Sequence, residues 1–225
     1  MSNFYVRGTL ANLITLAILL ACLFIPAGTL NYWQAWVFVV VFEVSAQALG
    51  IYFLVHDRKL IERRMNIGPM AEQRPVQKLI SALFILGVVG FVVFPAFDHR
   101  FGWSPVAPVV SVIANAMIVL SFLLFFAVMK SNSYAASTIQ VEEGQSVVST
   151  GPYAYVRHPM YSGVLLLLVP MPLALGSWWS IFFVVPFFPV LVWRIFDEEL
   201  FLRKNLPGYD EYMQRVRYRL VPRMW

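Results

Sequence analysis

The stretch YSGVLLLLVPMPLALGSWWSIFFVVPFFPVLVW, residues 161–193, has no charged side chain. Its roughly 33 residues would make a helix of about 50 Å, too long for one crossing of a hydrocarbon core of about 30 Å. Pro170, Pro172 and Gly176 interrupt a helix near the middle of the stretch, and the two tryptophans that follow are typical of a membrane interface. We therefore predict a helical hairpin, with its turn near residues 175–177 and arms of about 15 residues each.

The remaining sequence also indicates a bilayer environment. Hydrophobic residues make up 60% of the 225 residues and charged residues 13%, against about 25% charged residues in soluble domains. Four further apolar runs are each close to the about 20 residues that span hydrocarbon, namely 9–25, 33–54, 79–97 and 106–129. The predicted fold class is an all-α polytopic membrane protein with four spans and a C-terminal helical hairpin.

The composition and the placement of a few residues argue against a secretory signal, a cysteine-based site and a nucleic-acid-binding protein. The first run follows Arg7 as in a secretory signal, but its length and the lack of a clear A-x-A site favour a retained helix. Cys22 is the single cysteine, so an intrachain disulfide or a multi-cysteine zinc site is excluded, and we predict no metal site. The formal charge of +5 does not indicate nucleic-acid binding, because the basic residues gather in loops beside the spans.

The basic residues predict the orientation of the chain. The loop 56–78 is rich in them, whereas the loop after the third span contains only Arg100. The positive-inside rule places the loop 56–78 in the cytoplasm. If residues 161–193 form a hairpin, the N- and C-termini are also cytoplasmic.

Two polar segments, 130–159 and 194–225, flank the hairpin and hold most of the polar chemistry. The hairpin brings both to one membrane face. We therefore divide the chain into residues 1–130, with four transmembrane helices and the basic loop 56–78, and residues 131–225, a candidate catalytic region made of a loop, the hairpin 161–193 and a tail.

Arg157 and His158 directly precede the hairpin. An arginine offers a planar fork to a carboxylate or phosphate, and a histidine exchanges protons near neutral pH. Taken alone, the pair is better explained by a snorkelling arginine and a histidine that satisfies a helix end.

Three acids, Asp197, Glu198 and Glu199, follow the second arm. Near the C-terminal end of a helix the dipole disfavours negative charge, and a cationic ligand would relieve that conflict. Further on, the pattern predicts a turn and a short helix with Tyr209 and Tyr212 on one face. An interfacial helix on anionic lipid is the alternative explanation for this tail.

In combination these segments resemble the integral membrane methyltransferases, a family that includes the isoprenylcysteine carboxyl methyltransferases and the phospholipid methyltransferases. The resemblance covers roughly residues 133–222, whereas the first 130 residues match only in having apolar spans. It is carried by Gln140, Val147-Val148, Gly151-Pro152-Tyr153, Arg157-His158-Pro159 with Tyr161 and Gly163, Glu198-Glu199 with Leu202, Gly208 with Tyr212, and Arg215-Val216.

The resemblance implies methyl transfer from S-adenosylmethionine to a lipophilic small molecule or lipidated substrate in the membrane, in a pocket that the cytoplasmic tail closes. Arg157 and Arg215 match arginines expected to orient an acceptor carboxylate, but the pair also suits a lipid phosphate beside a methylated amine. Acids and tyrosine faces suit a cofactor with an ammonium and a sulfonium. By position, the cofactor contacts come from Gln140, Val148, Tyr153, His158, Tyr161, Glu198 and Glu199.

Two other functions remain open. A membrane reductase of the sterol type has a similar C-terminal organisation but uses NADPH, whose 2′-phosphate needs added basic residues rather than acids. A non-enzymatic transporter or assembly protein usually places ionisable residues inside its spans, where this chain has only Glu43. We expect Glu43 to be hydrogen-bonded and to tie its helix to Ser111 or Asn115.

Overall fold

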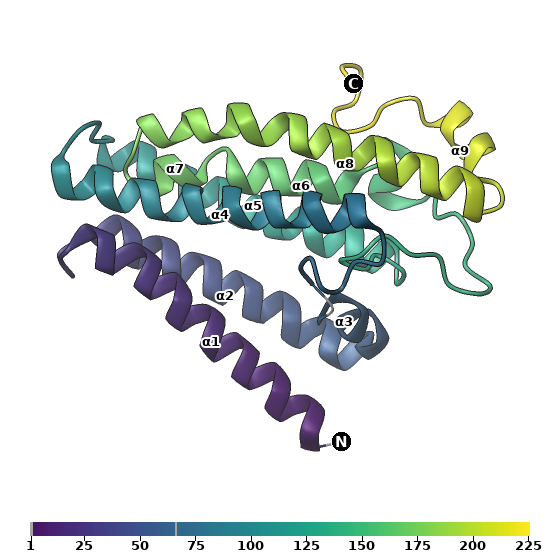
Figure 1. Cartoon of the computed structure of the whole chain (residues 1–225), viewed down its shortest axis with the longest axis horizontal. Coiled ribbons are helices and arrows are strands. Elements are labelled where there is room, and N and C mark those ends of the chain that lie inside the picture. Colours follow the sequence, from purple (N-terminus) through teal and green to yellow (C-terminus); the bar gives the residue numbers. More distant parts are fainter. Residues whose placement is uncertain (1, 66) are drawn as a thin grey trace.

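The computed structural model describes residues 2–65 and 67–225, and these residues form helices and no strands (Figure 1). The all-α fold class is confirmed. Along the chain the elements are α1 (Ser2–Ala27), α2 (Trp33–His56), α3 (Arg58–Met65), α4 (Pro75–Phe101), α5 (Pro108–Ser131), η1 (Gly151–Ala154), α6 (Pro159–Leu168), α7 (Met171–Ala174), η2 (Trp179–Phe183), α8 (Val184–Asn205) and α9 (Tyr209–Arg215).

Five helical segments are long and apolar enough to cross a membrane: α1, α2, α4, α5 and the continuous segment η2–α8. Their outward faces are apolar too. Val44 of α2, Val112 of α5 and Val185 of α8 are 63%, 57% and 67% exposed. An apolar surface of this extent is unfavourable in water but suits hydrocarbon. The chain is therefore a multi-pass membrane protein.

The helices run back and forth, so the start of α1, helix α3, the loop after α5 and helix α9 all lie toward one end of the bundle, and the C-terminus folds back along α8 (Figure 1). Helix α6 packs on α5, and α8 packs on α4. Gly163 allows the first of these contacts, since a Cβ at that position would lie 2.5 Å from Cε1 of Phe125.

The hairpin turn lies where the sequence predicts it. Gly176 adopts φ of +84°, which glycine reaches without strain, and the backbone N–H of Ser177 donates to the carbonyl of Pro172 at 2.9 Å. The turn is anchored by Asp98 of α4, which is buried and accepts hydrogen bonds from the hydroxyls of Ser104 and Ser177.

The lengths of the hairpin arms differ from the prediction. The first arm, Pro159–Ala174, is broken at Val169 and Pro170 into α6 and α7, whereas the second runs for 27 residues from Trp179 to Asn205. From the sequence, two equal arms are predicted, and the second is predicted to end at Trp193 because the next residue, Arg194, is charged. Arg194 is buried and fully paired (below), so its charge does not end the helix. The three acids consequently lie within α8 rather than after it.

The expected role of Glu43 is also corrected. Its carboxylate accepts a hydrogen bond from Nε2 of Gln47 at 3.4 Å. Ser111 instead donates to the carbonyl of Ala174 at 2.7 Å, and Nδ2 of Asn115 donates to the carbonyl of Ser111 at 2.9 Å. The Ser111 bond ties α5 to α7 and the Asn115 bond lies within α5; among the described residues, Glu43 makes no hydrogen bond to either of them.

Candidate functional site

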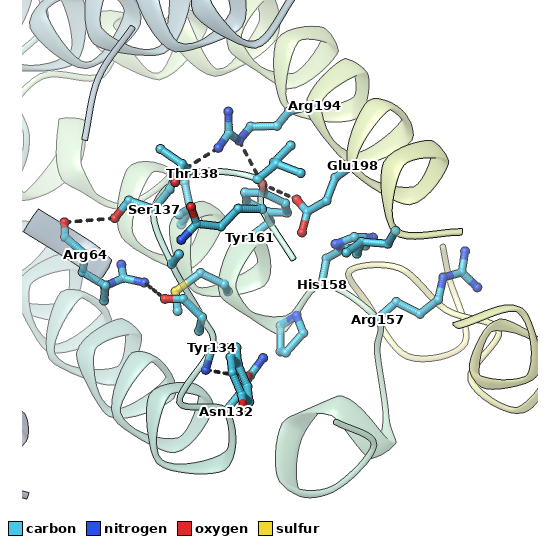
Figure 2. A pocket seen from close by; sticks show the side chains of 18 of the residues that line it. Arg64, Asn132, Tyr134, Ser137, Thr138, Arg157, His158, Tyr161, Arg194 and Glu198 are labelled. Atoms are coloured by element: carbon cyan, nitrogen blue, oxygen red, sulfur yellow. Dashed lines mark hydrogen bonds between the residues drawn. The ribbon is translucent and has the colours of Figure 1, made fainter. Parts of the chain in front are cut away.

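A cavity of about 500 Å³ lies at the end of the bundle that holds α3 and α9, within the about 300–1,000 Å³ typical of small-molecule sites. The polar wall of the cavity includes Arg64, Asn132, Tyr134, Gln140, Tyr153, Arg157, His158, Tyr161, Arg194 and Glu198 (Figure 2). The apolar wall includes Phe42, Phe84, Ile85, Val88, Val164, Leu168, Met171 and Phe187. Along α8, Glu198 and Phe187 are separated by about 16 Å of helix. The cavity thus has a polar mouth near the loops and an apolar floor among the spans.

The three consecutive acids of α8 point in three directions, because successive helical residues are about 100° apart. Asp197 accepts a hydrogen bond from Gln77 and pairs with Arg74, which fixes the start of α4. Glu198 faces the cavity. Glu199 points away from it and is buried. Only one of the three is therefore placed to touch a ligand.

Glu199 is the centre of a buried cluster of charges. Its Oε1 accepts from Nε of Arg157 at 2.8 Å and lies 3.2 Å from Nε2 of His158, while Oε2 accepts from Nε of Arg219 at 3.1 Å. The side chain of Glu199 is only 5% exposed. An anion can be buried at this depth because cations surround it.

Arg157 links this cluster to the tail. Its Nη1 donates to the carbonyls of Val216 at 2.9 Å and Arg217 at 3.0 Å, and its backbone N–H donates to the carbonyl of Tyr218 at 2.9 Å. The guanidinium borders the cavity. Most of its donors are nevertheless used to hold the tail against α8.

Arg194 and Tyr161 position Glu198 (Figure 2). The hydroxyl of Tyr161 donates to Oε2 of Glu198 at 2.6 Å and accepts from Nε of Arg194 at 2.9 Å. The rest of the Arg194 guanidinium donates to Oε1 of Gln77 at 2.6 Å and pairs with Glu72 at 3.0 Å. Because Tyr161 is itself held by Arg194, its hydroxyl positions one oxygen of the Glu198 carboxylate, Oε2.

Glu198 is the one acid on the cavity wall among the described residues, and none of them forms an ion pair with it. Neighbouring faces are aromatic and uncharged: Tyr153, Tyr161 and Tyr209 border the same space. Burial raises the pKa of Tyr153 to about 12, so its hydroxyl stays protonated at neutral pH. A carboxylate that has no direct ion pair among the described residues and lies beside tyrosine rings is suited to a positively charged ligand.

The structure brings most of the predicted site residues to this one cavity. The residues that line it are Gln140, Val148, Tyr153, Arg157, His158, Tyr161 and Glu198. Two others are elsewhere. Glu199 lies behind the wall in the cluster described above, and Arg215, the last residue of α9, is exposed and does not line the cavity.

Two residues of the cavity wall, Arg64 and Arg194, are not among the site residues predicted from the sequence. Arg194 carried a usable signal, because an ionisable residue at the end of an apolar run is a functional candidate. For Arg64 the sequence contains no such signal. It lies among other basic residues of a loop, and membrane topology explains their charge.

Comparison with known proteins gives two findings. Residues 109–207 match the phospholipid methyltransferase family. Over 88 residues the chain is 34% identical to a mouse protein named Delta(14)-sterol reductase TM7SF2, a match that covers 38% of this chain and 21% of that protein. The chain thus spans about a fifth of the length of this curated relative. The family match includes the hairpin, and the two matches differ in the chemistry that their names imply.

Proposed function

We propose that this chain, whose residues 109–207 belong to the phospholipid methyltransferase family, transfers a methyl group from S-adenosylmethionine to a lipophilic acceptor. The observation that carries the proposal is Glu198, a cavity carboxylate without an ion-pair partner among the described residues. It stands between a polar mouth and an apolar floor. A charged cofactor and a lipophilic acceptor need those two environments side by side.

The residues of the cavity fit the cofactor. S-adenosylmethionine bears an ammonium and a sulfonium, and it supplies an activated methyl group. Glu198 offers the ammonium a charge-assisted hydrogen bond. Tyr153 and Tyr209 border the cavity with aromatic faces that attract cations. Once the methyl group has left, the sulfur is neutral and this attraction weakens, which favours release of the product.

The protein's own contribution is alignment and exclusion of water. Tyr161 and Arg194 hold Glu198 in place, so the bound cofactor has one orientation. Apolar side chains from α4, α6 and α8, such as Val88, Val164 and Phe187, form the floor on which the acceptor's hydrocarbon chain would rest. The acceptor displaces the sulfur from the methyl group in line with the breaking bond, and this step mainly requires that the two molecules are aligned and that water is excluded.

The second candidate is an NADPH-dependent reduction, favoured by the similarity to the mouse sterol reductase. The 2′-phosphate of NADPH needs basic groups, yet two of the three guanidinium groups on the cavity wall, those of Arg157 and Arg194, are in ion pairs. Only Arg64 is left for the 2′-phosphate, and the carboxylate of Glu198 on the same cavity wall would repel the phosphates of NADPH but attract a cation. We therefore favour the sulfonium cofactor.

Isothermal titration of the detergent-solubilised protein separates the two functions. We expect S-adenosylhomocysteine to bind in the micromolar range or tighter, and NADPH to bind at least about 10-fold more weakly. Binding of NADPH without binding of S-adenosylhomocysteine would overturn the proposal.

The variant Glu198→Gln tests the site itself. Glutamine keeps the shape and the bond from Tyr161 but removes the charge, and a hydrogen bond to a charged group is worth about 1.5–3 kcal/mol. We expect affinity for S-adenosylhomocysteine to fall about 10- to 100-fold. The matched control is Glu211→Gln, which changes an exposed acid of α9 outside the cavity. Equal affinities in the two variants would remove Glu198 from the cofactor site.

A further inference from the structure

Three guanidinium groups line the cavity, and they differ in their partners. Arg157 pairs with Glu199, and Arg194 pairs with Glu72. Arg64 forms no ion pair with any described residue; its Nη1 donates to the backbone carbonyl of Ala135 at 2.9 Å. Arg64 is therefore the one guanidinium on the described cavity wall whose charge is not matched by a carboxylate.

Contacts between α3 and the loop after α5 aim Arg64 at the cavity. Its neighbour Arg63 donates from Nε and Nη2 to the two carboxylate oxygens of Glu142, at 2.5 and 2.6 Å. The hydroxyl of Ser137 donates to the carbonyl of Arg64 at 3.2 Å. These bonds hold the end of α3 against the loop, and Arg64 lies on the cavity wall beside it (Figure 2).

This arrangement is unfavourable without a ligand. The guanidinium of Arg64 is partly removed from water, and burial lowers its pKa below the ordinary value. A desolvated cation is stabilised by an anion that it can bind through two parallel N–H donors, such as a carboxylate or a phosphate. No carboxylate of the described cavity wall serves this purpose, because Glu198 bonds to Tyr161 instead.

We propose that Arg64 binds an anionic group, a phosphate or carboxylate, of the lipophilic acceptor. This inference rests on the proposed methyltransferase function and adds a residue to it: Arg64 as the group that holds an acidic headgroup of the acceptor. Arg64 lies outside residues 109–207, so the part of the chain that matches the family does not contain it.

The surroundings of Arg64 favour the acceptor over the cofactor as the source of the anion. Ile67 and Ile85 line the cavity near it and are 70% and 50% exposed, so the wall between α3 and α4 is apolar and accessible from outside. A hydrocarbon chain can lie there while its headgroup reaches Arg64. Figure 2 shows Glu198 on the opposite side of the site from Arg64. The ammonium and the carboxylate of the cofactor are attached to the same carbon, so a cofactor whose ammonium binds Glu198 also has its carboxylate away from Arg64.

The test compares Arg64→Gln with Arg64→Lys and with the matched control Lys59→Gln, which removes an exposed charge from the same helix. The probes are dihexanoyl phosphatidic acid, dodecanoate and uncharged dihexanoylglycerol, titrated into the solubilised protein with and without S-adenosylhomocysteine. Affinity of each variant for S-adenosylhomocysteine is measured separately. Thermal unfolding verifies that each variant is folded.

We expect Arg64→Gln to weaken binding of at least one anionic probe about 10- to 100-fold, with affinity for dihexanoylglycerol and S-adenosylhomocysteine unchanged within about twofold. Arg64→Lys should keep part of the anion affinity, because it keeps the charge but not the planar fork. Lys59→Gln should leave all affinities unchanged.

Two results would overturn the assignment of Arg64. One is unchanged affinity for both anions in Arg64→Gln. The other is a loss confined to S-adenosylhomocysteine or NADPH, which would make Arg64 a cofactor residue. Failure of the wild-type protein to bind S-adenosylhomocysteine would instead overturn the proposed function. The titrations without that ligand would still decide whether Arg64 binds an anion.

Discussion

Nε of Arg157 lies 2.8 Å from Oε1 of Glu199, and this contact joins the segment before the first hairpin arm to the last third of the second arm. The bond lies directly behind the cavity wall. Because Arg157 also holds the carbonyls of Val216 and Arg217, the pair connects α6, α8 and the tail in one buried unit. The cavity therefore depends on a charge pair that is placed to support it rather than to bind ligand.

The variant Glu199→Gln should be destabilising. The variant removes the carboxylate that pairs with Arg157, and the guanidinium of Arg157 stays buried. Removal of one partner of a buried ion pair costs about 3–5 kcal/mol. We expect a fall in the midpoint of thermal unfolding in detergent that is much larger than for Glu198→Gln. Similar midpoints for the two variants would show that Glu199 has no special structural role.

This separation of two adjacent acids could not be predicted from the sequence. The pattern of charge and hydropathy gave the spans, the turn near Gly176 and the cluster of polar residues at one end of the bundle. It treated Glu198 and Glu199 as equivalent, because the direction of each side chain depends on where α8 ends and how it is rotated against α4 and α6. Those quantities are set by tertiary packing.

The position of Arg64 shows a second limit. In the sequence its charge has a sufficient explanation in membrane topology. Its place on the cavity wall depends on contacts between α3 and the loop after α5, such as the pair of Arg63 with Glu142 across a separation of 79 residues. Long-range ion pairs of this kind cannot be predicted from the local pattern of charge and hydropathy, whereas the apolar spans and the glycine of the turn can.

Tyr161→Phe should weaken cofactor binding through Glu198. The variant removes the hydroxyl that donates to Glu198 at 2.6 Å and accepts from Arg194 at 2.9 Å. We expect an affinity for S-adenosylhomocysteine about 5- to 10-fold lower, a smaller loss than in Glu198→Gln, because the variant keeps the carboxylate and loses only the bond that orients it. In a double-mutant cycle with Glu198→Gln, measured by isothermal titration, the two effects should be less than additive. Strict additivity would mean that Tyr161 acts independently of Glu198.

Gly163→Ala should separate α6 from α5. The added Cβ would lie 2.5 Å from Cε1 and 2.8 Å from Cδ1 of Phe125, and overpacking of this kind costs about 1–3 kcal/mol. We expect a lower unfolding midpoint in detergent. Adding Phe125→Leu, which removes the ring edge, should restore part of the loss. If the double variant is less stable than Gly163→Ala alone, the clash is not the cause.

The pair of Arg63 and Glu142 should make the stability of the α3 region depend on pH. The hydrogen bond from Arg63 lowers the pKa of the Glu142 carboxyl below its ordinary value of 4.5. A carboxyl whose pKa is lower in the folded state stabilises that state fully above the ordinary pKa, and the contribution is lost as the pH falls through the lowered pKa. The effect should be modest, because the side chain of Glu142 is 37% exposed and solvent screens the pair.

Thermal unfolding of the wild-type protein and of Glu142→Gln at pH 7 and at pH 3 measures this contribution. At pH 7 the wild type should be more stable, because the variant lacks the charge that Arg63 binds. At pH 3 the difference should shrink, because the wild-type carboxyl begins to take up a proton. Affinity of Glu142→Gln for dihexanoyl phosphatidic acid should also fall at pH 7, since a looser α3 no longer holds Arg64 against the cavity. A stability difference that stays constant between the two pH values would contradict the ion pair as its source.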